Sequence, residues 1–183
     1  MNPLRSILEG PVLDAAPALL GWRLRSRIDN VVTEIVVTEV EAYDGANDPA
    51  SHAFRGRSPR NLTMFGEPGG LYVYRSYGIH WCMNVVTGPK GRAAAVLLRA
   101  GVPTVGHVAM VKRRGRQDHL TDGPGKLCQA LGVTGVHDGA RLLGRGVLSL
   151  KPGLAPTTVE QTGRIGISKA VDRTWRFVTS DVV

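Results

Sequence analysis

The sequence contains only two cysteines, Cys82 and Cys128, among 183 residues. Two isolated thiols form neither a metal-binding spacing nor a disulfide framework, and a reducing, cytoplasmic compartment is the simplest interpretation. Long apolar runs are also missing: the longest, Ala93–Leu98, is far shorter than the roughly 20 residues of a membrane-spanning helix. Near the start of the chain, Glu9 and Asp14 interrupt the apolar stretch, which argues against a signal peptide. We therefore expect a soluble protein with no membrane partner.

Sequence signatures of several enzyme classes are absent. The chain has no GxGxxG and no GxxxxGK[ST] pattern, so dinucleotide and P-loop nucleotide binding lack support. It has no CxxC, HExxH or GxSxG pattern, which argues against zinc hydrolases and serine hydrolases with a nucleophile elbow. The histidines are scattered and do not suggest a set of metal ligands: His52, His80, His107, His119 and His137.

Basic side chains outnumber acidic ones. The 23 Lys and Arg residues against 15 Asp and Glu give a net charge of +8 and an isoelectric point near 10.1. This excess favours a polyanionic partner, with nucleic acid as the first candidate; the alternative is a solvated surface that only maintains solubility. The basic residues form clusters within the body of the chain: Arg23, Arg25 and Arg27; Arg55, Arg57 and Arg60; Lys112, Arg113, Arg114 and Arg116; and Arg164, Lys169, Arg173 and Arg176.

The pattern of apolar residues predicts an α+β protein with a mainly antiparallel sheet and helices at its margins. The length favours one domain, residues 1–183. We expect strands at 22–28, 31–43, 71–75, 79–87, 94–100, 147–150, 164–168 and 175–179, and helices at 14–20, 48–54, 104–114 and 125–131.

Three of the four tyrosines fall in one short stretch, LYVYRSYG. Tyr72 and Tyr74 are two residues apart and share one face of the predicted strand. Tyr77 lies in the turn beside Gly78, where a core residue is not expected. An aromatic side chain at a hairpin tip of a basic protein can enter a duplex and replace a base. The alternatives are a turn tyrosine packed on a neighbour and, for Tyr72, an ordinary core aromatic.

Together these segments resemble the alkyladenine DNA glycosylase family, also called the methylpurine or 3-methyladenine DNA glycosylase family. The resemblance runs from about residue 14 to residue 177, nearly the whole chain. The segments that carry it are VTEVEAYDG (Val37–Gly45), DPASHAFRG (Asp48–Gly56), PRNLTMF (Pro59–Phe65), PGGLYVYRSYGIHWCMNVV (Pro68–Val86), VLLRA (Val96–Ala100), DGPGKLCQALGV (Asp122–Val133), RIGI (Arg164–Ile167) and WRF (Trp175–Phe177).

The resemblance implies a fold and an activity. The fold is a single domain with a curved, mainly antiparallel sheet and a protruding β-hairpin that inserts into DNA. The activity is removal of damaged purines such as 3-methyladenine, 7-methylguanine, hypoxanthine and ethenoadenine. Such an enzyme flips the nucleotide out of double-stranded DNA and hydrolyses the N-glycosidic bond, leaving an abasic site. The resemblance further implies a monomer that needs no metal and no cofactor.

The resemblance also assigns the chemical step. Glu41 matches the general base that activates water, and Arg99 matches the residue that helps to hold this water. A carboxylate suits the reaction because it accepts a proton and stabilises an oxocarbenium-like sugar. The alternatives are an exposed strand-end glutamate and, for Arg99, a structural ion pair. Glu34 and Glu39 lie nearby but match no catalytic position of the family.

The remaining matches concern binding of the base and of DNA. Tyr43, His52 and Tyr74 match the residues that stack on the flipped base, and aromatic faces attract cationic rings. Asn84 matches a steric gate that clashes with the 2-amino group of guanine. In the hairpin, Tyr77 matches the intercalating tyrosine, with Ile79 as its apolar neighbour.

Two other function classes remain open. A non-catalytic nucleic-acid-binding module, for instance one that binds RNA, would share the charge, the hairpin and the aromatic residues but would not need Glu41 beside Arg99. A bifunctional glycosylase/lyase would need a lysine nucleophile in the pocket. None of the lysines lies in the segments expected to form the pocket: Lys90, Lys112, Lys126, Lys151 and Lys169.

Overall fold

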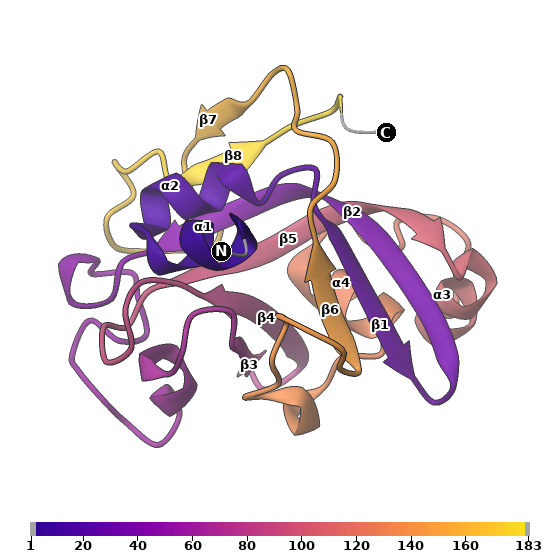
Figure 1. The fold of residues 1–183 in the computed structure, drawn as a ribbon, viewed down its shortest axis with the longest axis horizontal. Helices are drawn as coiled ribbons and strands as arrows, with labels where there is room; N and C mark the ends of the chain where they lie inside the picture. Colours follow the sequence, from indigo (N-terminus) through magenta and orange to yellow (C-terminus); the bar gives the residue numbers. More distant parts are fainter. Residues whose placement is uncertain (1–2, 182–183) are drawn as a thin grey trace.

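A curved antiparallel sheet with few helices makes up the fold (Figure 1), in a computed structural model that describes residues 3–181. The strand order is β3-β4-β5-β2-β1-β6. Outside this order, β8 pairs with β2 and β7 pairs with β8. The strands are β1 (Arg23–Ile28), β2 (Val31–Tyr43), β3 (Leu71–Ser76), β4 (His80–Val86), β5 (Ala95–Val105), β6 (Leu148–Lys151), β7 (Glu160–Thr162) and β8 (Arg176–Val178). The helices are α1 (Pro3–Glu9), α2 (Val12–Ala18), α3 (His107–Arg114) and α4 (Pro124–Leu131), with 3-10 turns η1 (Gly45–Asn47), η2 (Leu62–Phe65) and η3 (Gly135–His137). The predicted α+β class with a mainly antiparallel sheet is confirmed.

Strand β2 is the longest strand of the described residues, and it pairs with strands from both the N-terminal and the C-terminal parts of the chain. It spans the predicted residues because its Val, Ile and Thr side chains favour extended backbone. One edge pairs with β5 along most of its length. The other edge pairs first with β1 and then, from Glu39 to Glu41, with β8. The C-terminal strands are thereby held beside the second half of β2 (Figure 1).

The two faces of the sheet have different roles. On one face, alternate residues of neighbouring strands, such as Val40, Leu98 and Val85, form the main core with α2 and α4. Side chains of a strand alternate between faces, so the residues between them point to the other side. That other face carries Glu41 and Asn84, which are buried polar residues. The polar side chains expected at the site therefore share one face.

A break in the register of β2 and β5 lies beside Glu41. Leu98 pairs with Val40 and Ala100 pairs with Glu39, so Arg99 has no partner residue in β2. Such a β-bulge bends the strand and redirects a side chain. Here it allows the Arg99 guanidinium to reach both Glu39 and Glu41.

The predicted β3–β4 hairpin is present and ends in a tight turn. The amide of Ile79 donates to the carbonyl of Ser76 at 3.0 Å. The two residues between them, Tyr77 and Gly78, both have positive φ, +50° and +68°. Glycine adopts this conformation freely, whereas a tyrosine rarely does. The tip thus places an aromatic side chain where the backbone alone would favour glycine, asparagine or aspartate.

Two helix predictions need correction. The helix expected at 48–54 is absent, and the segment forms successive turns. Asp48, expected as its N-cap, instead directs its carboxylate to Arg164, and only Oδ1 also accepts from the Ala50 amide. The helix expected at 104–114 begins only at His107, because β5 continues through Val105 and Gly106 turns the chain with a φ of +80°.

The strand expected at 164–168 is also wrong. The Ile165 amide donates to the Glu41 carboxylate instead of a strand partner, and Gly166 has a φ of +75°. The segment is therefore a loop that crosses the polar face of the sheet. Two elements had not been predicted, α1 and β7.

Candidate active site

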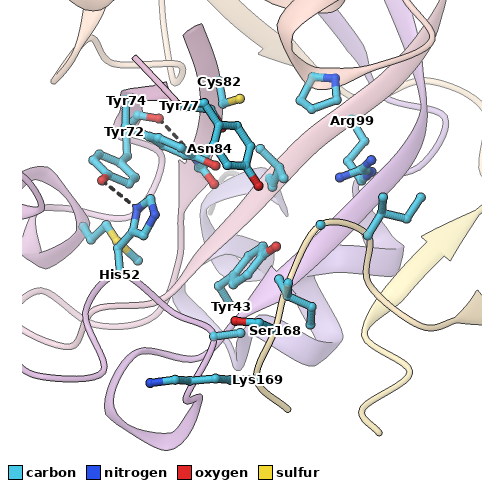
Figure 2. Close-up of a pocket in the computed structure, with 18 of the residues that line it drawn as sticks. Tyr43, His52, Tyr72, Tyr74, Tyr77, Cys82, Asn84, Arg99, Ser168 and Lys169 are labelled. Carbon is cyan, nitrogen blue, oxygen red and sulfur yellow. Dashed lines mark hydrogen bonds between the residues drawn. The ribbon is translucent and has the colours of Figure 1, made fainter. Parts of the chain in front are cut away.

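A cavity of about 630 Å³ opens on the polar face of the sheet (Figure 2). Its walls come from the ends of β2 to β5, the turns around His52, the hairpin tip and the loop from Ile165 to Lys169. Pockets of this size accommodate small-molecule ligands. The structure brings six of the predicted site residues to its lining: Tyr43, His52, Tyr74, Tyr77, Asn84 and Arg99.

The cavity floor follows from the register of the sheet. Glu41 pairs with Leu97, Leu97 with Asn84, and Asn84 with Tyr72, on four adjacent strands. Paired residues point to the same face, so these side chains form one row across β2, β5, β4 and β3. Leu97, Asn84 and Tyr72 line the cavity, whereas the Glu41 side chain is fully buried at the end of the row.

The Glu41 carboxylate is held by two hydrogen-bond donors and one ion pair. Oε1 accepts from the Ile165 amide at 2.7 Å and lies 3.2 Å from Arg99 Nη1. Oε2 accepts from the Tyr43 hydroxyl at 2.8 Å. Burial, followed by the Glu41 charge and this hydrogen bond, raises the pKa of Tyr43 far above its usual value. The phenol therefore remains a donor to the carboxylate at all physiological pH values.

Arg99 links Glu41 to a second carboxylate. Its Nε donates to Glu39 Oε1 at 2.8 Å, and the same oxygen accepts from Arg176 Nε at 2.6 Å. Burial lowers the pKa of Arg99, but the charge of Glu41 and the hydrogen bond to Glu39 outweigh it and raise the pKa above its usual value. Glu39, which matched no catalytic position, therefore orients the arginine beside Glu41.

An aromatic wall stands opposite Tyr43 (Figure 2). The His52 ring meets the Tyr74 ring edge-on, with centroids 4.5 Å apart, and Tyr72 stacks on Tyr74 at 5.5 Å. His52 Nδ1 lies 3.1 Å from the Tyr72 hydroxyl. Burial, and then the charge of Arg60, lowers the pKa of His52, so the ring is neutral at pH 7. Tyr72, expected to be a core aromatic, is buried but also shapes this wall.

Asn84 is buried in the cavity floor with a fixed orientation. Its Nδ2 donates to the Tyr72 carbonyl at 3.1 Å, across the β3–β4 pair. A side chain held in this way cannot swing aside without losing a buried hydrogen bond. The floor next to Leu97 is therefore rigid.

The hairpin tip projects its side chains into solvent. Tyr77 is 86% exposed and Ile79 is 67% exposed. Tyr77 still borders the cavity, whereas Ile79 does not line it. The tip is thus beside the cavity mouth and makes little contact with the rest of the chain.

Sequence reasoning missed several residues around the site. Arg164 and Asp48 form a fully buried ion pair, 2.5 Å apart, next to Tyr43. Lys169, placed outside the pocket by its position in the sequence, lines the cavity at the end of the 165–169 loop. The RIGI and DPASH segments were recognised, but nothing in the sequence indicated that they meet across more than 100 residues.

Among residues 3–181, no group of three or more His, Cys, Asp or Glu side chains is arranged to hold a metal ion. Over the same residues, no helix is both long and apolar enough to cross a membrane. Cys82 and Cys128 are both free and buried.

The chain was compared with known proteins. The family model for methylpurine-DNA glycosylase matches residues 6–182. Similar proteins named "Putative 3-methyladenine DNA glycosylase" include one from Rhodopseudomonas palustris, 49% identical over 94% of this chain and 84% of that protein. Others come from Frankia casuarinae, 44% identical over 91% and 84%, and Nitrosospira multiformis, 48% identical over 90% and 83%.

These matches define the class of protein as a DNA glycosylase, a hydrolase of DNA repair. The match covers almost every residue of the chain, including the segments that form the cavity. The chain belongs to the methylpurine-DNA glycosylase family.

Proposed function

We propose that this protein excises damaged purines from double-stranded DNA by hydrolysis, with Glu41 as the general base. The observation that supports this most directly is the buried carboxylate at the end of an aromatic cavity. A base inside a stacked duplex is out of reach, so the nucleotide rotates into the cavity before reaction. The substrate class is alkylated, deaminated and etheno purines, represented by 3-methyladenine, 7-methylguanine, hypoxanthine and ethenoadenine.

The hydrogen bonds of Glu41 determine which of its two carboxylate oxygens takes the proton from water. A carboxylate oxygen has about two acceptor positions. Oε1 accepts from the Ile165 amide and is in ionic contact with Arg99, whereas Oε2, among the described residues, accepts a hydrogen bond only from Tyr43. Oε2 therefore takes the proton of the water whose oxygen attacks C1′. The bond from C1′ to the purine nitrogen breaks, its electron pair leaves with the base, and the sugar becomes abasic. A cationic alkylated purine leaves directly as the neutral base, whereas hypoxanthine and ethenoadenine leave as anions that take a proton from solvent.

The aromatic side chains of the cavity walls determine which purine binds there. Tyr43 on one side and His52 with Tyr74 on the other form the walls that hold a flat ring. Aromatic faces attract electron-poor and cationic purines more strongly than normal ones. An alkylated cationic purine also leaves as a neutral molecule, which lowers the barrier to bond cleavage. Asn84, fixed to the Tyr72 carbonyl, disfavours the 2-amino group of guanine by steric clash, so that a guanine is excised only where, as in 7-methylguanine, alkylation has already weakened its N-glycosidic bond.

Tyr77 and Ile79 enter the duplex in this proposal. Tyr77 fills the gap left by the flipped nucleotide, and Ile79 packs beside it against the neighbouring bases. The high exposure of both side chains supports this role. We further propose that residues 1–183 act as one domain and as a monomer, without metal or cofactor, on cytoplasmic or nucleoid DNA.

The proposed reaction is monofunctional. Strand cleavage through a Schiff base would need a lysine amine at C1′. Lys169 lines the cavity but is exposed, and its amine points away from Tyr43 in Figure 2. Borohydride trapping of a covalent complex with damaged DNA distinguishes the two reactions: we expect no trapped product.

The function is tested with duplexes that each contain one damaged purine, by measuring release of free base. We expect release by the wild-type protein and intact strands before alkali treatment. Glu41→Gln is the matched control, because it preserves shape but cannot take a proton. General-base loss typically reduces the rate by about 100-fold or more, and binding of damaged DNA is retained. Release at the wild-type rate by Glu41→Gln overturns the mechanism, and no release of any purine by the wild type overturns the function.

A further inference from the structure

Arg164 occupies a closed position behind Tyr43. Its Nη1 and Nη2 each donate to one oxygen of Asp48, at 2.5 and 2.9 Å. Neither side chain has any exposed surface. Nη1 also donates to the carbonyl of Ala42 at 2.9 Å. A bidentate arginine–carboxylate pair fixes both the distance and the plane of the guanidinium.

The same guanidinium is stacked between two aromatic rings. Its central carbon lies 4.7 Å from the centre of the Tyr43 ring and 5.1 Å from that of the Trp175 ring. A planar arginine restrains such rings by cation–π attraction. The back of Tyr43 is therefore supported by a group that Asp48 holds in place.

Arg164 also controls a second contact of Glu41. The next residue, Ile165, donates its amide to Glu41 Oε1 at 2.7 Å. Both hydrogen-bond donors to Glu41 thus depend on Arg164: the Tyr43 hydroxyl through ring stacking, and the Ile165 amide through the chain. Arg164 itself does not line the cavity, and it makes no hydrogen bond to Glu41.

We infer that Arg164, held by Asp48, is a positioning residue that sets the geometry of Glu41, and this inference rests on the proposed function. A buried ion pair is often no more stabilising than well-packed apolar residues of similar volume. Here Nε of Arg164 is also buried without a hydrogen-bond partner, which adds a cost. Stability alone therefore does not account for this pair, whereas alignment of Tyr43 and Ile165 does.

The test separates alignment from folding. Arg164→Met leaves the buried Asp48 charge with only the more distant Arg173, 3.8 Å away, as an ionic partner, so we expect it to melt at a lower temperature. Combining Arg164→Met with Asp48→Leu replaces the whole pair by apolar side chains, which commonly preserves stability. We expect the double variant to be folded and to bind damaged DNA like the wild type. Its single-turnover excision should still fall by roughly 10- to 100-fold, as for a small misplacement of catalytic groups.

Two further variants complete the experiment. Arg164→Lys retains the charge but neither the bidentate contact nor the planar stack, so excision should be slow while the fold persists. The matched control is Arg5→Met combined with Glu9→Leu, which removes an exposed ion pair of 2.7 Å on α1 and should leave excision unchanged. Excision at the wild-type rate by the folded double variant at 164 and 48 overturns the inference. Failure of the wild type to release any base instead overturns the proposed function.

Discussion

Arg99 contacts Glu39 through Nε at 2.8 Å and Glu41 through Nη1 at 3.2 Å. The shorter contact is to the glutamate that the proposed reaction does not use. Glu39 therefore forms the closer ion pair with Arg99 and holds the guanidinium to one side of Glu41. The first prediction concerns the removal of the negative charge of Glu39.

Glu39→Gln should slow excision by about tenfold, because Arg99 then loses its charged partner and shifts towards Glu41. The arginine would compete with the water for the carboxylate. Single-turnover kinetics on an ethenoadenine duplex measure this change, with Glu34→Gln as the control on the same strand, since Glu34 contacts Arg25 and Thr104 instead. Equal rates for the two variants would show that Glu39 has no influence on Glu41.

The second prediction concerns the hairpin tip. Tyr77→Ala removes one stacking contact, worth about 1–3 kcal/mol in nucleic-acid complexes. The flipping equilibrium should fall by roughly 5- to 150-fold. The loss should be smaller for a mispaired lesion, which already costs less to extrude. Single-turnover excision of one lesion opposite different bases measures this pattern.

Tyr77→Phe is the control for that experiment, because it preserves the aromatic ring. The melting temperature should change little in either variant, since Tyr77 is 86% exposed. A uniform loss in every base-pair context, or a large fall in melting temperature, would assign Tyr77 a structural role instead.

The third prediction is a pH dependence that comes from His52. Burial and Arg60 hold the pKa of His52 below its ordinary value of 6.5. At a pH between the pKa of His52 in the folded protein and that in the unfolded chain, the unfolded chain binds more protons than the folded protein. The stability contributed by neutral His52 is therefore present above pH 6.5 and is lost as the pH falls through the pKa of the folded protein. The protonated ring would also repel a cationic base. Excision of cationic 3-methyladenine should therefore decline on acidification more than excision of neutral ethenoadenine.

His52→Phe should remove that difference between the two substrates. The phenyl ring retains the stacking surface but cannot be protonated, and Glu41 is common to both proteins. The measurement is the ratio of the two single-turnover rates from about pH 7.5 down to about pH 5, a range that includes the ordinary pKa of histidine. A ratio with the same pH dependence in wild type and variant would exclude His52 as the titrating group.

The fourth prediction separates phosphate contacts from structural arginines. Affinity for duplex DNA should fall steeply with salt, because bound basic side chains displace counterions. Arg55 is exposed and lies three residues after the cavity-lining His52, so Arg55→Gln should reduce the salt slope by about one. Arg57 and Lys112 are candidates of the same kind.

Arg113, which belongs to the same basic cluster as Lys112, is a structural arginine and serves as the comparison. Its guanidinium donates to the carbonyls of Ala130 and Ile28, at 3.1 and 3.2 Å. Arg113→Gln should therefore lower the melting temperature with little effect on the salt slope. An affinity that does not change between low and physiological salt would argue against DNA as a partner.

The sequence predicts best those elements that local composition determines. Strand β2 and the β3–β4 hairpin follow from β-branched residues, alternation and a Tyr-Gly turn. The row of Tyr72 and Tyr74 follows from a period of two, and both line the cavity.

Features that depend on distant partners are not predictable in this way. Asp48 has the local character of a helix N-cap, but a buried arginine 116 residues away outweighs that tendency. The segment at 164–168 has alternating apolar residues, yet its amide is used by Glu41. The bulge at Arg99 depends on the register of two long strands, which no local pattern fixes.

The order of the chain has a consequence for synthesis. Glu41 and Tyr43 emerge from the ribosome more than 100 residues before Arg164, Ile165 and β8, and N-terminal parts of a chain are free to fold first. Strands β1 to β5 can pair before the loop that holds Glu41 exists. A nascent chain can therefore form its aromatic hairpin before its carboxylate is aligned, and under the proposed mechanism it cannot act on DNA until the segment with Arg164 and Ile165 has been translated.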